Sequence, residues 1–365
     1  MKIVHLIEQL GIGGAEKDLI EKSLVLSKKD VTLLVFCFYR RGILANNLER
    51  NNIQVISLEN NSKPLSIIKG AFLLNKIMKN HLPDIIHSHM YSGEMLVSFY
   101  KLLFSTPAKC ISSVQSLHTQ IRKRNMPARK FLDRLVIKHY HKFIACSQAV
   151  KYELVHKGYP EKAVEVIYNG VDFSHCNSSH PDKKSKEKPI IGVISRLAHY
   201  KGIDFLIKAV PSVVQIYPQC EFWIIGDGSE KSNLIKLTNE LNISRFVSFL
   251  GSQTNIHDYL SRLTILVVPS LCEPLGISAI EGLAEKIPVI ATAVDGLPEI
   301  IINNKTGFLV QPGKPDEIAN KIIWILQNYP EAQQIARQGF DYAKDTFNLQ
   351  KVTEQQFMLY QTLLS

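Results

Sequence analysis

Two carboxylates with seven residues between them, Glu273 and Glu281, stand out in the stretch PSLCEPLGISAIEGL at residues 269–283. The apolar run before Glu273 predicts a strand and the pattern around Glu281 predicts a helix, so the acids flank a strand-to-helix turn. A carboxylate can accept two hydrogen bonds from a vicinal diol, and each acid therefore suits a sugar ring. The alternative, an acid favoured by the helix dipole, accounts for Glu273 but leaves Glu281 unexplained.

The turn between these acids is the start of the predicted helix. Leu275, Gly276 and Ile277 stand there, and the first backbone N–H groups of a helix have no partner within it. These amides are therefore candidates to donate hydrogen bonds to phosphate oxygens or sugar hydroxyls.

A pair of cations, Arg196 and Lys201, lies in SRLAHYKG at residues 195–202, after the first predicted strand of the second half. Two cations at the carboxyl end of a strand suit a diphosphate. The alternative, two solvated surface charges, explains this segment equally well when it is taken alone.

A Gly-rich turn, LGIGGAEK at residues 10–17, follows the first predicted strand. Backbone amides near Gly13 and Gly14 can approach a phosphate at the start of the next helix, although a plain tight turn explains the segment equally well. The dinucleotide-binding fingerprint is not met, because Ala15 and Glu16 stand where the third glycine belongs.

His87 and His89 form an H-x-H pair on a predicted strand, and both side chains therefore point to the same face. Such a pair can ligate a metal, but no third ligand lies nearby in the sequence, so the prediction is that no metal is bound. Cys272 has no neighbouring base and is interpreted as a small packed side chain, not as a nucleophile.

The length and composition indicate a globular protein. The chain has 365 residues, of which 45% are hydrophobic and 21% charged, and this length predicts two domains. No apolar stretch reaches the roughly 18 residues of a membrane span, and the amino-terminal segment lacks signal-peptide features. The six cysteines are scattered, as is typical of reduced thiols, and the expected location is the cytoplasm.

Positive charge is concentrated in the first half of the chain. Residues 1–178 hold 25 Lys or Arg and 14 Asp or Glu, whereas residues 179–365 hold 18 and 19. The first half is therefore expected to meet something anionic. A nucleic-acid binder would explain this charge but not the two acids. RNA readout also favours aromatic residues among the basic ones, and residues 121–138 contain only Phe131.

The order of the predicted elements indicates an α/β fold. Apolar strands alternate with amphipathic helices through residues 1–173, which predicts a parallel sheet covered on both faces. Residues 174–189 are polar and lysine-rich and are predicted to be a linker. The α/β pattern restarts over residues 190–346, where TGFLVQPG is predicted to be a hairpin-like turn. The prediction is two doubly wound, Rossmann-like domains facing across a cleft.

Taken together, these motifs resemble the retaining GT-B glycosyltransferases of family 4, the glycosyl transferases group 1 type. The strongest element is EPLGISAIE, which matches the Glu, seven residues, Glu signature of that family. Around it stand, in the family's order, GGAE, PDIIHSH, IACSQAV, VIYNGVD, SRLAHYKG, IIGDG, FLG, VDGLPEII and TGFLVQPG. The resemblance covers essentially the whole chain. It implies a GT-B fold, with residues 1–173 as the acceptor-binding domain, residues 190–346 as the nucleotide-sugar-binding domain, and a helix at 347–365 packing back on the first domain.

The resemblance also implies a role for each matching residue. His118 and Glu273 would be the catalytic residues beside the transferred sugar. The donor would be bound by Glu281 at the ribose, Arg196 and Lys201 at the diphosphate, the backbone of Leu275, Gly276 and Ile277 beside it, Gly13 and Gly14 in a closing loop, and Leu250 and Gly251 at the base. Asp295 departs from the family, which often has a glycine there, and this departure is expected to affect the shape of the loop and not activity.

The implied reaction moves a hexosyl or N-acetylhexosaminyl group from a nucleotide diphosphate sugar to an acceptor hydroxyl, with retention and without a metal. No cofactor is expected, the nucleotide sugar is a co-substrate, and a UDP-sugar is favoured over a GDP-sugar. The implied setting is the synthesis of cell-surface polysaccharide, lipopolysaccharide or glycolipid, with a lipid-linked or glycan acceptor. The alternatives are an NADP-dependent oxidoreductase that uses Arg40 and Arg41 beside the Gly-rich turn, and a basic nucleic-acid-binding protein.

A basic segment follows the SLHT motif and is the candidate acceptor or membrane site. Its cations are Arg122, Lys123, Arg124, Arg129 and Lys130. Each Lys or Arg near an anionic leaflet contributes about 1 kcal/mol, so the segment is expected to dock on an anionic membrane, placing the protein peripherally on the inner face of the plasma membrane. The alternative is an apolar stripe packed on the sheet with its cations merely solvated.

Overall fold

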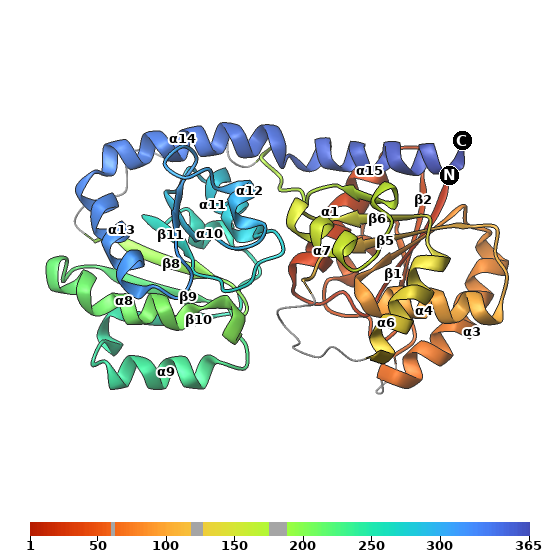
Figure 1. Ribbon diagram of the computed structural model, residues 1–365, viewed down its shortest axis with the longest axis horizontal. Coiled ribbons are helices and arrows are strands. Elements are labelled where there is room, and N and C mark those ends of the chain that lie inside the picture. Colours follow the sequence, from red (N-terminus) through yellow and green to blue (C-terminus); the bar gives the residue numbers. More distant parts are fainter. Residues whose placement is uncertain (60–62, 118–126, 175–187) are drawn as a thin grey trace. The chain divides into compact units, whose positions relative to one another are not determined.

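The computed structural model forms two compact units. Unit 1 contains Met1–Gly170 and Leu349–Ser365, and unit 2 contains Val171–Asn348. The structure describes residues 1–59, 63–117, 127–174 and 188–365, with the backbone alone for 63–66 and 127–132. Both units have an α/β fold, as Figure 1 shows.

The sheet of unit 1 has seven strands, all parallel, in the order β3-β2-β1-β4-β5-β6-β7. The strands are β1 (Lys2–Ile7), β2 (Thr32–Cys37), β3 (Gln54–Ser57), β4 (Ile85–His89), β5 (Lys109–Val114), β6 (Lys142–Ala145) and β7 (Val164–Val166). Residues of β1 and β4 are buried almost without interruption, as expected for parallel strands covered on both faces. The strand order reverses between β1 and β4, which makes their carboxyl ends the switch point of this unit.

Seven helices surround this sheet in the described part of the chain. They are α1 (Gly14–Leu26), α2 (Ala45–Glu49), α3 (Lys63–His81), α4 (Met90–Leu103), α6 (Pro127–His139), α7 (Gln148–His156) and α15 (Leu349–Leu364). The last of these closes the core of the unit, because Val352, Leu359 and Tyr360 are buried with Ile3 and Leu19. Figure 1 shows α15 running beside α1, which it contacts.

The sheet of unit 2 has six parallel strands in the order β10-β9-β8-β11-β12-β13. The strands are β8 (Ile190–Ile194), β9 (Glu221–Ile225), β10 (Val247–Gly251), β11 (Ile265–Val268), β12 (Val289–Thr292) and β13 (Phe308–Val310). The order reverses between β8 and β11, which are hydrogen-bonded neighbours. Strand β8 begins directly after the predicted linker 174–189, of which 175–187 fall outside the described residues.

The prediction of a hairpin-like turn at TGFLVQPG is wrong. Residues Phe308–Val310 form β13, which pairs parallel with β12. The physical reason is burial, because Phe308 is fully buried and its ring meets Trp324 edge to face at 5.4 Å. The glycines and the proline that flank this segment are typical of a hairpin turn. The short apolar run between them instead forms a strand, because its side chains are buried in the core.

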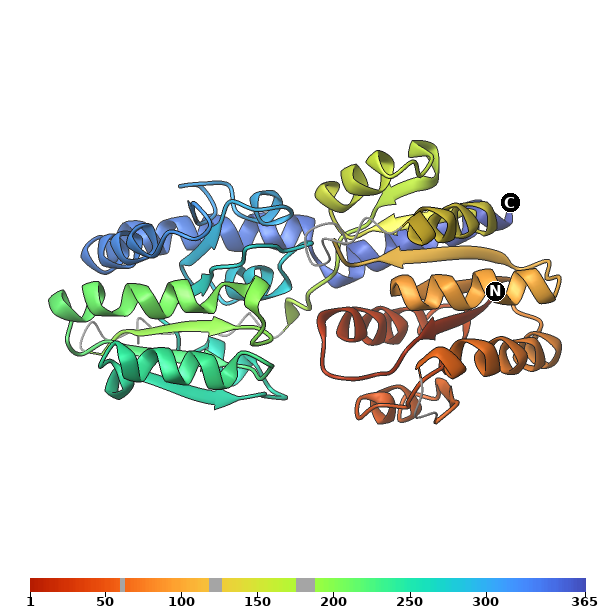
Figure 2. The same ribbon diagram turned by 60° about the horizontal axis from the view of Figure 1, so that its bottom comes forward.

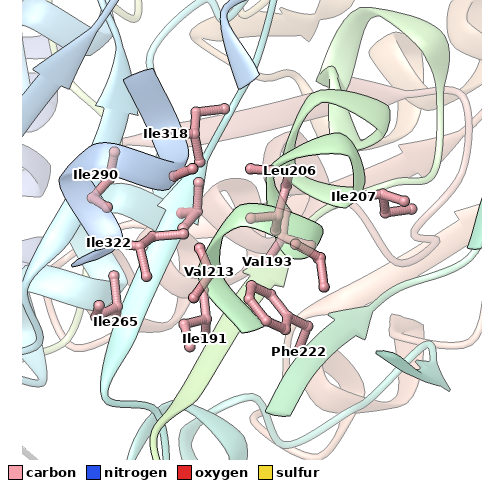
Figure 3. Close-up of a cluster of buried hydrophobic side chains, with 14 of the residues drawn as sticks. Ile191, Val193, Leu206, Ile207, Val213, Phe222, Ile265, Ile290, Ile318 and Ile322 are labelled. Carbon is pink, nitrogen blue, oxygen red and sulfur yellow. The ribbon is translucent and has the colours of Figure 1, made fainter. Parts of the chain in front are cut away.

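The helices of unit 2 pack on the sheet. They are α8 (Ile203–Ile216), α9 (Lys231–Glu240), α10 (His257–Leu260), α11 (Ile277–Ala284), α12 (Leu297–Ile300), α13 (Pro315–Gln327) and α14 (Tyr329–Thr346). Among them, α8, α9 and α13 bury apolar side chains with the strands of the sheet in one cluster. Figure 3 shows Leu206 of α8 and Ile322 of α13 packed against Ile191 and Phe222 of the sheet. This packing holds β8 in the sheet, and the loop that leaves β8 carries part of the candidate site. None of the described helices is long and apolar enough to cross a membrane.

Candidate active site

The carboxyl ends of β8 and β11 position the candidate site in unit 2. These neighbouring strands end at Ile194 and Val268. In open parallel sheets, ligands bind outside the carboxyl ends of the strands where the strand order reverses. The loop after β8 carries Arg196 and Lys201, and the loop after β11 carries Glu273, so the topology brings the predicted cations and one predicted acid to the same end of the sheet.

Lys201 and Glu273 form an ion pair at this edge. The Lys201 Nζ lies 2.6 Å from Glu273 Oε2, and Ser270 Oγ donates to the same oxygen at 2.9 Å. The side chains are only 17% and 9% exposed, so water screens their attraction less than it would on the open surface. The sequence assigned both residues to a donor site but did not indicate that they pair with each other.

The backbone locks the two loops together. The Leu271 N–H donates to the Tyr200 carbonyl oxygen at 2.8 Å. Gly202 has φ +61°, and a Cβ at this position would lie 2.1 Å from the Pro269 carbonyl oxygen. Only glycine fits so close an approach in the left-handed region, and the position of Lys201 therefore depends on its neighbour.

Asp295 holds the other side of Glu273. Its Oδ2 accepts a hydrogen bond from the Glu273 backbone N–H at 2.9 Å, and the Gly296 N–H donates to the Glu273 carbonyl oxygen at 3.1 Å. Asp295 has φ +45°, a conformation that aspartate tolerates better than most residues with a side chain. This contact explains why an aspartate occupies a position where glycine is frequent. The sequence predicted that Asp295 affects only the shape of the loop, whereas the structure places it in contact with Glu273.

The amino terminus of α11 opens beside Glu273. Gly276 is its N-cap, with φ +107° and no side-chain cap, so the first amides of the helix have no capping side chain. A Cβ at Gly276 would lie 2.5 Å from Leu297 Cδ2, which explains the glycine. Leu275 is buried and Glu281 is half-buried within α11. The structure therefore brings Glu273, Gly276 and Glu281 onto one turn and the helix that follows it.

Arg196 is exposed, and its guanidinium makes no hydrogen bond or ion pair to any other residue that the structure describes. An exposed guanidinium on the loop that also carries Lys201 can bind a phosphate through two parallel hydrogen bonds.

Cys272 stands directly beside Glu273 and is buried. Burial first, and then the neighbouring Asp295 carboxylate, raises the pKa of the Cys272 thiol to about 12. The thiol is therefore protonated at neutral pH and lacks the reactivity of a thiolate, which agrees with its interpretation as a packed side chain.

The residues assigned to the base lie at the edge of the same sheet. Leu250 and Gly251 end β10, and both are half-buried. The Leu250 carbonyl oxygen accepts a hydrogen bond from Gln253 Nε2 at 2.6 Å, and Gly251 has φ +69° with open space where a Cβ would lie. In sheet order, β9 separates this strand from β8.

The remaining predicted residues belong to unit 1 or fall outside the described residues. Gly13 is the N-cap of α1 and Gly14 is its first residue. A Cβ at Gly13 would lie 2.3 Å from Glu16 Oε2, so the Glu16 carboxylate folds back over this turn. The residues outside the description are His118, Arg122, Lys123 and Arg124, while Arg129 and Lys130 lie in α6 with the backbone alone described. Strand β5 ends at Val114.

The sheet of unit 1 adds one histidine that the sequence did not connect with the others. His5 of β1 stands in register opposite His87 of β4, and His89 follows on the same face of β4. No local pattern links His5 to the H-x-H pair, because 82 positions separate it from His87.

Two parallel sheets in Rossmann-like order, with cations and an acid at a switch point, define the class of protein as GT-B. The family model for glycosyl transferases group 1 matches residues 177–341, and the model for glycosyltransferase family 4 matches residues 12–175. The chain belongs to this family, and it is a glycosyltransferase.

Similar proteins share the same assignment. An uncharacterised glycosyltransferase of Methanocaldococcus jannaschii is 29% identical over 303 residues, covering 74% of this chain and 75% of its own. The N-acetyl-alpha-D-glucosaminyl L-malate synthase of Bacillus anthracis is 23% identical over 288 residues, covering 77% and 75%. The crystal structure of Anabaena HepE in complex with UDP-glucose matches with a TM-score of 0.84 at 22% identity, covering 99% of this chain and 100% of that chain, which shows that the two share a fold. The family assignment replaces the oxidoreductase and nucleic-acid-binding alternatives.

Proposed function

We propose that the protein is a retaining, metal-independent glycosyltransferase that moves a hexosyl or N-acetylhexosaminyl group from a UDP-sugar to an acceptor hydroxyl. The observation that carries the proposal is the Lys201–Glu273 pair at 2.6 Å, at the switch point of unit 2. Two relatives support the choice of donor and sugar. HepE was crystallised with UDP-glucose, and the Bacillus anthracis relative is named as an N-acetylglucosaminyl L-malate synthase.

The two oxygens of Glu273 have different surroundings. Oε2 is held by Lys201 and Ser270, whereas Oε1 makes no hydrogen bond to any other residue that the structure describes. We assign Oε1 to the hydroxyls of the transferred sugar, because a carboxylate oxygen accepts such bonds readily. Oε2 then fixes the orientation of the carboxylate and holds Lys201 in the site.

The leaving diphosphate gathers negative charge as the glycosidic bond breaks. Lys201 Nζ and the Arg196 guanidinium supply positive charge where this happens, and the backbone N–H groups at Gly276 and Ile277 supply hydrogen-bond donors. These groups take the part that a divalent cation plays in metal-dependent transferases. Retention follows in this proposal from attack on the face that the leaving group occupies, with the donor phosphate accepting the proton of the acceptor hydroxyl.

The donor assignment is tested by a hydrolysis screen without acceptor across UDP- and GDP-sugars, with the anomeric configuration of the released sugar read by NMR. Arg196→Ala and Lys201→Met should each reduce turnover by about ten- to hundredfold, since each loses a bond to a charged group. Lys208→Met is the matched control, because Lys208 lies on α8, is exposed, and makes its only ion pair in the described part of the chain with Asp204 at 2.8 Å. Preference for a GDP-sugar, inversion, or loss of turnover in EDTA with recovery in Mg²⁺ or Mn²⁺ would each overturn the corresponding part of the proposal.

The acceptor is proposed to be lipid-linked or membrane-presented, in the synthesis of cell-surface polysaccharide, lipopolysaccharide or glycolipid. Besides the basic segment at 122–130, one described surface of unit 1 supports this. It consists of exposed residues of the neighbouring helices α3 and α4, which Figures 1 and 2 show side by side. The exposed residues of this α3–α4 surface are Ile68, Lys69, Phe72, Lys76, Lys79, Leu102 and Leu103.

The chemistry of the α3–α4 surface fits an anionic membrane. Helix α3 contains no acidic residue. Phe72 and Leu102 are each 58% exposed, and the Phe72 ring lies 5.5 Å from that of Phe104, which joins the two helices. Lysines around exposed aromatic and aliphatic side chains are typical of surfaces that insert at the headgroup level.

Liposome co-sedimentation tests this part of the proposal at low and high salt. Wild type should sediment with anionic vesicles at low salt and be released at high salt, because the Debye length falls to about 3 Å at 1 M salt. A triple variant, Lys69→Ser with Lys76→Ser and Lys79→Ser, should bind less, as should Arg122→Ser with Lys123→Ser and Arg124→Ser. Equal binding to neutral vesicles, or full binding by both triple variants, would contradict membrane docking while leaving glycosyl transfer untouched.

A further inference from the structure

Three histidines meet in the interior of unit 1, where β1 and β4 lie side by side. His5 is 2% exposed, His87 0% and His89 3%. One nitrogen of each lies within 4.8 Å of the corresponding nitrogens of the other two. The closest approach is between His5 Nδ1 and His89 Nε2, at 3.0 Å. The His87 and His89 rings are stacked with their centroids 4.4 Å apart.

The hydrogen bonding of this histidine cluster is incomplete. If His5 Nδ1 and His89 Nε2 share one proton, the outer nitrogens of the two rings need an acceptor and a donor respectively, or the reverse. Those outer nitrogens, His5 Nε2 and His89 Nδ1, have no hydrogen-bond partner among the described residues. Buried polar atoms in proteins usually have a hydrogen-bond partner. The cluster therefore contains two buried ring nitrogens that could bind a further group.

The surroundings of His87 supply a supporting hydrogen bond for a ligand ring. Its Nδ1 lies 2.6 Å from the Tyr360 hydroxyl and its Nε2 lies 2.8 Å from Ser113 Oγ. When one nitrogen of a histidine binds a metal, the other usually keeps a hydrogen-bond partner that fixes the ring. His87 retains such a partner whichever nitrogen takes the metal.

The charged residues nearest the cluster would not repel a bound cation strongly. Lys22 lies close enough to act on His87 and His89, but its Nζ is 3.0 Å from Asp18 Oδ1 and donates to the Tyr168 carbonyl oxygen. This ion pair is buried and carries no net charge, so a bound cation would not face an isolated lysine.

We propose that His5, His87 and His89 form a metal site that takes a zinc-class transition-metal ion, with Zn²⁺ as the ion of choice. Imidazole nitrogens suit this class of metal, and Zn–N distances of about 2.0–2.1 Å in a tetrahedral site need facing nitrogens roughly 3.4 Å apart. The 3.0 Å contact would open by a few tenths of an ångström, while the widest nitrogen separation in the cluster, which is at most 4.8 Å, would close by up to about 1.4 Å. The ion would tie β1 to β4 and, through His87 and Tyr360, hold α15 to the sheet. The site lies within unit 1, whereas the Lys201–Glu273 pair that carries the proposed function lies within unit 2.

The test uses the full chain, purified without a metal-binding tag. Zinc content is measured by mass spectrometry after equilibration with Zn²⁺ and desalting, and Co²⁺ is titrated into chelator-treated protein as a spectroscopic probe. One zinc per chain, the visible bands of nitrogen-ligated tetrahedral cobalt, and a rise in the melting temperature of roughly 5–10 °C at a hundredfold excess over Kd are expected.

Variants locate the ion. His5→Gln and His89→Gln should each reduce zinc content and cobalt absorbance at least tenfold, whereas His156→Gln, at an exposed histidine of α7, should change neither. If the buried variants do not fold, zinc-edge X-ray absorption of the unaltered protein decides the question, because three imidazole ligands should be visible. Substoichiometric zinc with no cobalt bands, or a spectrum without three imidazoles, would reduce the cluster to a stack of neutral side chains and overturn the proposal.

Discussion

The Lys201–Glu273 pair makes the most demanding prediction. Lys201→Met removes the ammonium but keeps most of the aliphatic stem, and it leaves Glu273 Oε2 with only the Ser270 hydroxyl among its described partners. Removing one member of a buried pair costs about 3–5 kcal/mol, and a hydrogen bond to a charged group contributes about 1.5–3 kcal/mol. Because the pair is largely but not fully buried, we expect a loss of about 2–3 kcal/mol in the free energy of unfolding of unit 2.

A double-mutant cycle with Glu273→Gln isolates the pair. The free energy of unfolding of the double variant should fall by about 1–2 kcal/mol less than the sum of the losses in the two single variants. The reason is that, once Lys201 is replaced, Glu273→Gln removes a charge that has already lost its partner. The chain has two tryptophans, Trp223 and Trp324, and both lie in unit 2. Urea unfolding followed by tryptophan fluorescence therefore reports on the unit that holds the pair.

Turnover is measured on the same variants. Each single change should reduce donor hydrolysis by about ten- to hundredfold, which corresponds to the loss of a charge-assisted bond. Lys208→Met is the control, because an exposed i,i+4 pair contributes only about 0.3–0.5 kcal/mol. Strictly additive single and double losses would show that the pair does not exist in solution, and wild-type turnover in both single variants would reject the catalytic roles.

Three further outcomes are expected. Gly202→Ala should lower both stability and turnover more than Gly313→Ala, as measured by urea unfolding and donor hydrolysis, because both glycines have positive φ but only the first would bring a Cβ within 2.1 Å of the Pro269 carbonyl oxygen. Cys272→Ala should keep turnover within about twofold, since a thiol whose burial and neighbouring carboxylates raise its pKa to about 12 is no nucleophile; a hundredfold loss would contradict this. Unit 1 should lose stability as pH falls from about 6.5 towards 4, because burial lowers the pKa of His5 to about 4 and only the unfolded chain takes up that proton. On the order of 3 kcal/mol is lost by pH 4 from this group alone, which hydrogen exchange of peptides from β1 and β4 should detect and His5→Gln should diminish.

Much of the fold could be predicted from local patterns. Continuous apolar strands such as β1 and β4 separated by amphipathic helices have few solutions other than a parallel sheet covered on both faces. The exception, β13, shows the limit of that reasoning. Phe308 lies in a segment whose glycines and proline resemble a turn. It pairs with β12 because its ring is buried against Trp324, a contact that local sequence patterns do not indicate.

The candidate site was predictable where a single segment carries it. Glu273, Gly276 and Glu281 belong to one strand-turn-helix unit, and their spacing already indicates an acid, an open helix terminus and a second acid. Contacts between segments were not predictable. The spacing of residues along the chain does not indicate that the Asp295 carboxylate binds the Glu273 backbone N–H. It also does not indicate that Lys201 binds the Glu273 carboxylate.

The sequence by itself therefore determined the α/β class, the strand-to-helix turns and the family, because each depends on residues close together along the chain. Tertiary structure alone decided which loops meet. Parallel neighbours require crossover connections, so β8 and β11, or β1 and β4, are adjacent in the sheet but distant in sequence. The pairing of Lys201 with Glu273 and the meeting of His5 with His87 and His89 both occur at such borders, where the strand order reverses, and the sheet order that places them there is set by the packing of the whole unit.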